Sequence, residues 1–386
     1  MFLPSNVKMI IEKLEKSGFQ AYVVGGCVRD SVMGNEPKDW DITTSALPEQ
    51  TALVFSFFRL IMQGVKHGTV GVVVDGEVYE ITTMRCDGEY TDSRRPENVS
   101  FVKNINEDLK RRDFTVNALA FNEKTGVVDI SGGMEDIKNK IIRTVGDADT
   151  RFSEDALRIM RCLRFASVLG FSIEEKTSLS VRKNKELLRN IAVERINVEF
   201  TKLICGDNAL KIIDEYKDVI DVFIEDFSTI SREDMAHACS LEKEADVRLC
   251  ALLHSFGEQK ARDVLVSLRY PKKTINLVCS LIEHYNYPCH DLPRTRFLVG
   301  KLGADTVLKL SHLRRDKQAA SFVEQILQEN LCCTISQLDI TGAELKEIGI
   351  HGRKTGTVLE KMLKFVIEEK LENEKNTLLE FAETCK

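Results

Sequence analysis

The distribution of proline divides this chain into parts that can fold differently. Four of the seven prolines precede residue 97 and the other three lie between residues 271 and 293, so the 174 residues from Glu97 to Tyr270 contain none. Long helices can run there without interruption. Runs of β-branched and aromatic residues instead crowd the first 145 residues, as in Ala21–Val24, Thr69–Val74 and Val78–Thr83. The sequence predicts that strands and helices mix in the N-terminal part.

From about residue 150 the apolar residues recur at helical spacing. Leu157, Met160 and Leu163 do so with charged residues between them. We therefore place the boundary between a mixed part and a helical part near residues 145–150, which makes the chain an α+β protein. A length of 386 residues allows two or three domains.

Composition limits the environment of the chain. Residues are 43% hydrophobic and 30% charged, as in ordinary globular proteins, and no apolar run approaches the roughly 18 residues of a membrane span. The first residues alternate charged and aliphatic side chains instead of forming a signal-peptide core. None of the eleven cysteines lies in a Cys-x-x-Cys pair, which favours reduced, mostly buried thiols. We expect a cytoplasmic protein without membrane contact.

The net charge of −6 gives no general attraction to nucleic acid. A polynucleotide would have to be held by local basic surface. The segment Arg294–Lys317 is a candidate, because it carries seven Lys or Arg residues against two Asp or Glu residues. A solvated helix face is the alternative interpretation.

A hairpin is predicted around Asp75–Gly76, which stands between two apolar runs. This dipeptide is a strong signal for a two-residue turn. Counting outward pairs Val74 with Glu77 and Gly71 with Glu80. Glu80 should therefore face a residue that has no side chain.

The segment Tyr22–Asp30 reads as a strand, a glycine turn at Gly25 and Gly26, and the start of a helix. Such a turn aims backbone N–H groups at an anion, so phosphate binding is a candidate role. The turn alone is weak evidence, because no Gly-x-x-x-x-Gly-Lys-Ser/Thr motif is present. A purely structural turn is the alternative.

Two aspartates follow ten residues later. Asp39 and Asp41 run into Ile42, and in an extended strand positions i and i+2 point to the same side. Carboxylate oxygens together with water and phosphate suit Mg²⁺, and Glu80 on a nearby strand would complete a two-metal platform. A solvated loop is the usual reading of an isolated Asp-x-Asp.

The helical pattern of Glu154–Arg164 places Asp155, Arg158, Arg161 and Arg164 at every third residue, in one slowly rotating stripe. A carboxylate accepts hydrogen bonds and a guanidinium donates them. Asp155 beside Arg158 would match cytosine and adenine, which offer an amine next to an unprotonated ring nitrogen. Uracil and guanine would leave buried groups unpaired. A structural ion pair with solvated arginines is the alternative.

Taken together, the glycine turn, the Asp-x-Asp and the strand carboxylate resemble the nucleotidyltransferase superfamily related to DNA polymerase β. Four further segments are similar to successive motifs of class II tRNA nucleotidyltransferases, a family that includes CCA-adding enzymes and bacterial poly(A) polymerases. These segments are Lys110–Ala118, Asp129–Asp136, Arg151–Arg164 and Ala192–Arg195. The motifs span roughly residues 20–200, and the resemblance of the remainder, notably Ile340–Gly356, is looser.

The resemblance implies an architecture. It comprises a polymerase-β-like nucleotidyltransferase head with a mixed sheet at 1–147 and an all-helical neck with a base-recognition helix at 148–205. A helical body and tail that bind tRNA would follow at 206–386.

The resemblance also implies a chemistry, in which CTP and ATP are added to the 3′ end of tRNA with Mg²⁺ and without a template. Asp39, Asp41 and Glu80 would be catalytic, with the metal on the two aspartates. Asp113 and Asn117 would order the loop and the sugar site. The nucleotide-binding set would be Gly25, Gly26, Arg29, Arg112, Glu154, Asp155, Arg158, Arg161 and Arg164.

Alternatives stay open within the resemblance. A poly(A) polymerase or an enzyme adding only the final A would carry the same motifs, and a non-catalytic RNA-binding protein is a rival of another class. The polar segment 86–98 resembles the loop that the family needs to pass from C to A addition, which favours full CCA or A addition. We interpret His254 and His290 as structural and expect no protein partner.

Overall fold

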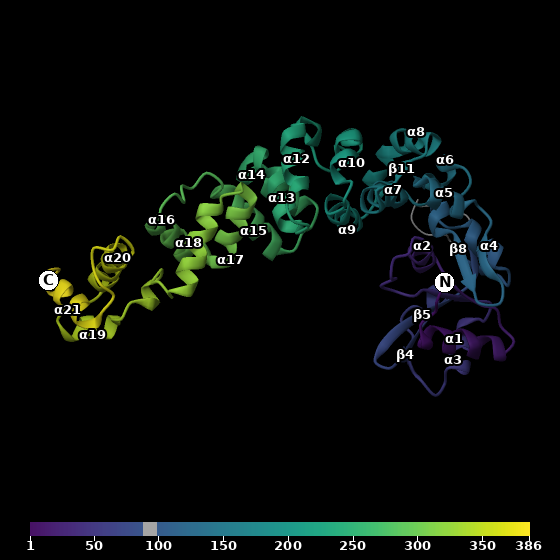
Figure 1. The fold of residues 1–386 in the computed structure, drawn as a ribbon, viewed down its shortest axis with the longest axis horizontal. Helices are drawn as coiled ribbons and strands as arrows, with labels where there is room; N and C mark the ends of the chain where they lie inside the picture. Colours follow the sequence, from purple (N-terminus) through teal and green to yellow (C-terminus); the bar gives the residue numbers. More distant parts are fainter. Residues whose placement is uncertain (88–98) are drawn as a thin grey trace. The chain divides into compact units, whose positions relative to one another are not determined.

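The computed structural model describes residues 1–87 and 99–386, which fold into two compact units, Met1–Arg232 and Glu233–Lys386. Strands of the described residues all lie in the first unit, and the second unit is helical (Figure 1). The predicted α+β class is confirmed. The segment predicted to act as a loop, 86–98, falls outside the described residues except for its first two positions.

The first unit is built on a seven-stranded mixed sheet with the strand order β3-β4-β5-β2-β1-β8-β9. Only β2 and β5 are parallel neighbours within it; the other pairs are antiparallel. The strands are β1 (Ala21–Val24), β2 (Ile42–Thr44), β3 (Arg59–Ile61), β4 (Thr69–Val74), β5 (Glu77–Thr83), β8 (Leu119–Asn122) and β9 (Gly126–Asp129). Two short pairs lie apart from it: β6 (Arg85–Asp87) with β7 (Val99–Phe101), and β10 (Ile141–Ile142) with β11 (Ser172–Ile173).

The predicted hairpin is confirmed in β4 and β5, where Val74 pairs with Glu77 and Gly71 with Glu80. Both turn residues, at 75 and 76, have positive φ (51° and 85°), as a primed two-residue turn requires. A Cβ on Gly71 would lie 3.1 Å from the Cβ of Ile61. Close packing of β3 on β4 thus explains the glycine opposite Glu80.

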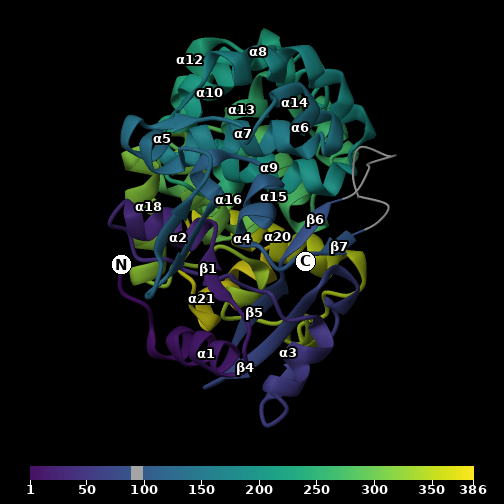
Figure 2. The ribbon, with the colours of Figure 1, turned by 90° about the vertical axis from the view of Figure 1, so that its right-hand side faces the viewer.

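Helices cover this sheet and continue the unit. Figure 2 shows strands β1, β4 and β5 with α1 and α3 beside them. In α1 the apolar face, Val7, Ile10, Ile11 and Leu14, is buried, as its amphipathic spacing requires. The head helices are α1 (Ser5–Lys16), α2 (Gly26–Val32), α3 (Pro48–Val54), α4 (Ile105–Lys110) and α5 (Gly133–Asn139), with 3₁₀ turns η1 (Val65–His67) and η2 (Thr115–Asn117).

The part of the first unit predicted to be the neck is helical apart from the two-residue strand β11, and α7 packs along α9. Leu157, Met160 and Leu163 are buried, as predicted. The boundaries proposed at 147 and 205 stay predictions. The elements here are α6 (Ala148–Glu154), α7 (Leu157–Leu169), α8 (Glu175–Asn184), η3 (Lys185–Asn190) and α9 (Val193–Ile204). The first unit continues past residue 205 with α10 (Ala209–Glu215), α11 (Lys217–Ile220) and η4 (Phe227–Thr229).

In the second unit, the buried side chain of Arg296 bonds to backbone groups near the last helices. Arg296 is 4% exposed and donates to the carbonyls of Cys332, Val366 and Ile367, which include last-turn carbonyls of α20. The elements are α12 (Arg232–Ser240), α13 (Ala245–Leu253), η5 (His254–Phe256), α14 (Gly257–Ser267), α15 (Lys272–Glu283), α16 (Leu292–Leu302), α17 (Ala304–Arg314), α18 (Lys317–Gln328), η6 (Ile335–Gln337), α19 (Gly342–Glu347), α20 (Arg353–Ile367) and α21 (Lys375–Glu383).

Two compositional expectations can be compared with the fold. Each of the eleven cysteines is a free thiol, and most are buried. Across residues 1–87 and 99–386, no helix combines the length and apolar character needed to cross a membrane.

Candidate functional site

The glycine turn between β1 and α2 lies against two arginines. Gly25 has a φ of 79°, which favours glycine, and a Cβ there would stand 3.0 Å from Nη1 of Arg112. A Cβ on Gly26 would stand 3.6 Å from Nη2 of Arg29. The absence of side chains therefore lets two guanidinium groups approach the backbone of the turn.

Arg29 is held firmly, with 8% of its surface exposed. Its Nη1 donates to Oδ1 of Asn117 at 2.5 Å and its Nε donates to Oδ1 of Asp30 at 2.8 Å. Asn117 in turn donates to Asp113 at 3.4 Å, and Asp113 accepts from the backbone N–H of Phe114. These bonds connect Asp113 and Asn117 within the loop, and their role at the sugar site stays a prediction.

Arg112 is positioned by a buried carboxylate. Asp108, with no side-chain exposure, lies 3.2 Å from Nη2 of Arg112 and 2.7 Å from Nη2 of Arg111. Burial would raise the pKa of Asp108, but Arg112 and Arg111 together hold this pKa below its ordinary value. Nε of Arg112 is buried and finds no hydrogen-bond acceptor among the described residues. The guanidinium thus keeps donor capacity beside the glycine turn.

The two aspartates lie just before β2, and not inside the strand as predicted, because β2 begins at Ile42. Asp39 and Asp41 both keep solvent access, and neither forms an ion pair or a side-chain hydrogen bond with the described residues. The pKa of Asp41 is raised by partial burial and by repulsion from Asp39, against the opposing effect of Arg112. Arg112 therefore does not fully compensate the negative charge of Asp41 in its partly buried position.

Glu80 is exposed on β5, and the register of β5 with β2 aligns Ile81 with Ile42. Asp41 and Glu80 each immediately precede one of these two aligned residues. Within the described ranges, no three or more Asp, Glu, His or Cys side chains gather closely enough to hold a metal. The structure does not bring Glu80 into such a group with the two aspartates, and its catalytic role stays a prediction.

Asp155 does not share a helix with the arginine stripe, which corrects the sequence interpretation. Helix α6 ends at Glu154, α7 begins at Leu157, and Asp155 between them is extended (φ −140°, ψ 102°). Its Oδ1 accepts from the backbone N–H of Leu157 at 3.1 Å, and this local bond competes with a continuous helix. Its Oδ2 accepts from Nη2 of Arg195 on α9 at 3.2 Å.

The carboxylate partner of Arg158 is Glu154 at 2.6 Å and not Asp155, so the alternative of an ion pair between Asp155 and Arg158 is not what the structure contains. The guanidinium also donates to the carbonyls of Arg151 and Arg111, each at 3.2 Å. Three of five possible donor positions are thereby used. Both Arg158 and Asp155 retain hydrogen-bonding capacity for a ligand.

Arg161 and Arg164 lie one turn apart on α7 and share one buried carboxylate, Glu199. Arg161 donates to Oδ2 of Asp113 at 2.7 Å through Nε, and its charge lowers the pKa of Asp113 although burial acts in the opposite direction. Glu199 on α9, 7% exposed, stands 2.9 Å from Nε of Arg164 and 4.0 Å from Nη1 of Arg161. The geometry of the closer contact is an ion pair without a hydrogen bond.

A single aromatic ring connects these arginines. The guanidinium carbons of Arg29, Arg161 and Arg164 lie 5.5, 5.2 and 3.9 Å from the ring centroid of Phe165. Phe165 packs edge-on against Phe114 at 5.8 Å. A ring face attracts cations, so this contact offsets part of the repulsion among three like charges.

Sequence reasoning missed four residues of this arrangement. Arg195 stood in a motif of the resemblance but received no role, and Phe165 was not singled out. The sequence did hold a signal for Asp108 and Glu199, because each lies among the apolar residues of a predicted helix face. A carboxylate in such a position is rarely buried unless it is paired with a cation. The four are Asp108, Phe165, Arg195 and Glu199.

The histidines set aside as structural make ordinary protein contacts. His254 lies against the ring of Tyr285, with centroids 4.7 Å apart, and a ring nitrogen is 3.3 Å from the carbonyl of Ala251. His290 contacts Arg294 and Asp291.

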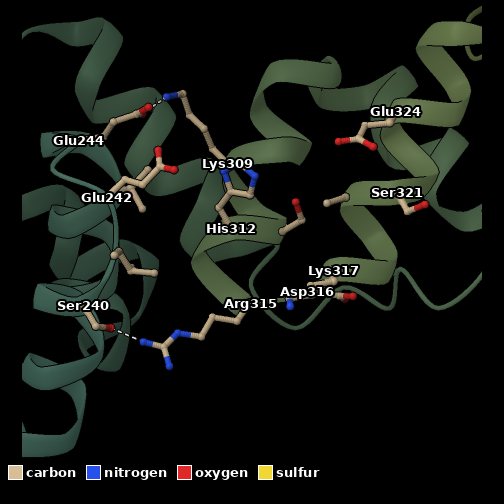
Figure 3. A pocket seen from close by; sticks show the side chains of 14 residues that line it. Ser240, Glu242, Glu244, Lys309, His312, Arg315, Asp316, Lys317, Ser321 and Glu324 are labelled. Atoms are coloured by element: carbon tan, nitrogen blue, oxygen red, sulfur yellow. Dashed lines mark hydrogen bonds and ion pairs between the residues drawn. The ribbon is translucent and has the colours of Figure 1, made fainter.

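The basic segment Arg294–Lys317 has fewer free cations for binding a polynucleotide than its composition suggested. Six of its seven cationic side chains bond to groups of the protein itself. Figure 3 shows a cavity of about 500 Å³ in the second unit, where Lys309 pairs with Glu244 and Arg315 bonds to Ser240. Lys309 and Arg315 are therefore engaged by groups of the protein, whereas Lys317 also lines the cavity.

The buried Asp108 makes stability depend on pH. Because its pKa is lowered on folding, its contribution is complete above the ordinary value of 3.8 and is lost as the pH falls through the lower folded value. We expect Asp108→Asn to lower the free energy of unfolding by about 3 kcal/mol at pH 7. This difference from wild type should become smaller below about pH 4. Urea unfolding followed by fluorescence of Trp40, the single tryptophan and a residue of the first unit, measures this.

Glu107→Gln is the matched control, because Glu107 is the exposed neighbour on α4. A difference in unfolding free energy between wild type and Asp108→Asn that stays constant from pH 7 to pH 3 would contradict the electrostatic account.

Comparison with known families matches three segments of the chain. Residues 21–143 match the poly A polymerase head domain, and residues 170–218 match the probable RNA and SrmB-binding site of polymerase A. Residues 240–382 match the putative domain 2 of tRNA nucleotidyltransferases.

Individual proteins match over nearly the whole length. A CCA-adding enzyme of Bacillus cereus (strain Q1) is 35% identical over 390 residues, which covers 97% of each chain. The crystal structure of the Bacillus stearothermophilus CCA-adding enzyme in complex with CTP superposes with a TM-score of 0.84 at 30% identity, covering 100% of this chain and 98% of that one. The Thermotoga maritima CCA-adding enzyme complexed with tRNA shares the fold, with a TM-score of 0.70 at 22% identity and coverage of 99% and 95%. The chain belongs to the family of class II CCA-adding enzymes.

Proposed function

We propose that this protein adds C, C and A to the 3′ end of tRNA, using CTP and ATP as substrates. The observation that carries the proposal is the full-length likeness to CCA-adding enzymes, with 97% of each chain aligned. The glycine turn, the two unpaired aspartates and the arginines of α7 give this family likeness a chemical basis in the chain itself.

Asp39 and Asp41 fit a divalent cation. Both carboxylates keep solvent access, and neither forms an ion pair with the described residues. Partial burial, and to a smaller extent repulsion from Asp39, raise the pKa of Asp41 against the effect of Arg112, so a bound cation would stabilise the ionised pair. Mg²⁺ prefers carboxylate oxygen, water and substrate phosphate. Bound there, it would lower the pKa of the attacking hydroxyl and neutralise phosphate charge.

The reaction forms a bond between the 3′-oxygen of the tRNA and the α-phosphorus of the nucleotide. The bond from the α-phosphorus to the bridging oxygen of the β-phosphate breaks, pyrophosphate leaves, and the hydroxyl proton passes to solvent. Arg29 and Arg112 would hold the phosphates above the glycine turn, where Gly25 and Gly26 admit a close approach. The reaction would need no nucleic-acid template, because side chains of the protein would select the base.

Base selection would fall to Asp155 and Arg158. Asp155 presents acceptors and is oriented by Arg195, while Arg158 presents donors and is oriented by Glu154. Cytosine and adenine share the complementary pair of an amine and a ring acceptor, so one site can serve both.

The same motifs fit an enzyme that adds only A, a poly(A) polymerase or a non-catalytic RNA-binding protein. The unpaired Asp39 and Asp41 favour a catalytic protein over the last of these. The predicted role of segment 86–98 in the change from C to A, the tRNA surface in the second unit and the cytoplasmic location stay predictions.

We expect Asp39→Ala and Asp41→Ala each to abolish nucleotide addition while leaving the fold intact. Removing one of two repelling carboxylates should hold or raise the melting temperature. Pyrophosphate release with tRNA, CTP, ATP and Mg²⁺, together with thermal unfolding, measures both effects. Glu36→Ala removes an exposed carboxylate from the same loop and should change neither. A wild-type rate of nucleotide addition by Asp41→Ala would contradict the assignment of Asp41 as a metal ligand.

We expect Asp155→Ala and Arg158→Ala to weaken discrimination against UTP and GTP as well as slowing addition. Each removes half of the base-reading pair, and a lost pairing costs about 1–3 kcal/mol, or roughly 10- to 150-fold. Single-turnover incorporation of each of the four nucleotides measures the ratio. Arg189→Ala, on the exposed side of the neck, is the control. Slower addition with unchanged selectivity would show that the pair is merely structural.

A further inference from the structure

The strand order places Asp41 between two different parts of the first unit. Asp41 precedes β2, and its carbonyl accepts from the backbone N–H of Val24, so the glycine turn that follows β1 adjoins it on one side. On the other side of β2 lies β5, which carries Glu80 one residue before its first aligned pair with β2. Beyond β5 the sheet continues through β4 to its edge at β3.

The proposed reaction gives these two sides different roles. In phosphoryl transfer the attacking and leaving oxygens lie roughly in line, on opposite sides of the phosphorus. With the leaving pyrophosphate on the side of the glycine turn, the 3′-hydroxyl of the RNA has to approach from the side of β5. The nucleotides that precede this hydroxyl then extend toward β4 and β3.

The face of these strands that carries Glu80 is open to solvent. Along β5, buried and accessible side chains alternate: Tyr79 is 7% exposed, Val78 is 53% exposed, and Glu80 is exposed as well. The opposite face of β4 and β5 packs against α3. Space for a polynucleotide therefore lies on the same face as the proposed catalytic carboxylates.

This open face combines apolar side chains with an unpaired cation. The register aligns Arg59 on β3 with Val73 on β4, and Val73 with Val78 on β5. Ile61 and Val78 flank Gly71, where a Cβ would stand 3.1 and 3.3 Å from their side chains. Arg59 is exposed, and its guanidinium makes no ion pair or hydrogen bond with the described residues.

The spacing of the sheet indicates which part of the RNA Arg59 can reach. Strands lie about 4.8 Å apart and residues rise about 3.3 Å along a strand, so the Cα atoms of Arg59 and Glu80 are separated by roughly 12 Å. A guanidinium at this separation suits a backbone phosphate that precedes the reacting hydroxyl, and the apolar side chains between suit the surfaces of sugar and base.

We propose that the 3′-terminal nucleotides of the RNA substrate lie across the open face of β5, β4 and β3, with Arg59 as a phosphate-binding residue. The inference rests on the proposed nucleotidyl transfer and adds the side of the acceptor RNA to it.

The test compares two RNAs on the full-length protein: a tRNA that ends in CC, and the same tRNA cut back to the last paired nucleotide of its acceptor stem. Dissociation constants are measured at several salt concentrations for wild type, Arg59→Gln and Arg59→Lys, and CTP binding is measured by calorimetry. Lys138→Gln removes an exposed cation from α5, which follows β9 at the other edge of the sheet, and serves as the matched control.

We expect Arg59→Gln to weaken binding of the tRNA that ends in CC by about three- to tenfold, because an exposed charge makes a modest contact. The slope of log affinity against log salt should become shallower by about 0.7, as expected for one lost phosphate contact on a single strand. The truncated tRNA and CTP should bind as they do to wild type. Arg59→Lys should restore most of the loss, and Lys138→Gln should match wild type.

The outcomes separate this inference from the proposed function. Unchanged binding of the tRNA ending in CC by Arg59→Gln would overturn the inference alone. Equal losses on the two RNAs would also overturn it, by assigning Arg59 to the double-stranded stem, and weaker CTP binding would assign Arg59 to the nucleotide instead. A wild-type protein that adds no nucleotide to the tRNA ending in CC would overturn the proposed function, and with it the inference.

Discussion

The gathering of three guanidinium groups around one aromatic ring is the constraint on which the candidate site depends. Arg29, Arg161 and Arg164 repel one another, and in water they would separate. The ring of Phe165 and the buried carboxylates of Asp113 and Glu199 hold them together. Each of the three also has a carboxylate partner, with Asp30 serving Arg29, and these contacts fix the guanidinium groups beside the glycine turn.

The same contacts connect the sheet-bearing part of the first unit to its helices. Arg161 on α7 reaches Asp113, Arg158 reaches the carbonyl of Arg111, and Arg151 donates to the carbonyl of Lys110. The loop after α4 is therefore bonded to α6 and α7 at three successive points. Groups proposed to read the base and groups proposed to hold the phosphates thereby belong to one framework, which is what selection without a template requires.

Local chemistry decided which parts of this structure could be predicted from the sequence. The hairpin register around Gly71 and Glu80 followed from two turn residues and a period of two, and the structure confirms it. The burial of Leu157, Met160 and Leu163 followed from helical spacing, because neighbours on one face share one environment.

Long-range contacts decided what could not be predicted. Periodicity suggested a helix running through Asp155, but this residue bonds to Arg195, 40 residues away, and to the N–H of Leu157. Arg158 has two carboxylates within reach, and spacing alone does not say which one it contacts. Phe165 has nothing in its local sequence to distinguish it from a core residue. Such choices depend on which helix packs alongside.

Sequencing the products made on a tRNA that ends at its discriminator base tests the central claim most directly. With CTP alone, the account predicts addition of two C residues. With CTP and ATP together, it predicts the addition of C, C and A and then a stop. Both nucleotides are used because one base-reading pair serves cytosine and adenine. A long poly(A) tail formed as readily on a generic RNA, or addition of A only to tRNA already ending in CC, would contradict the account.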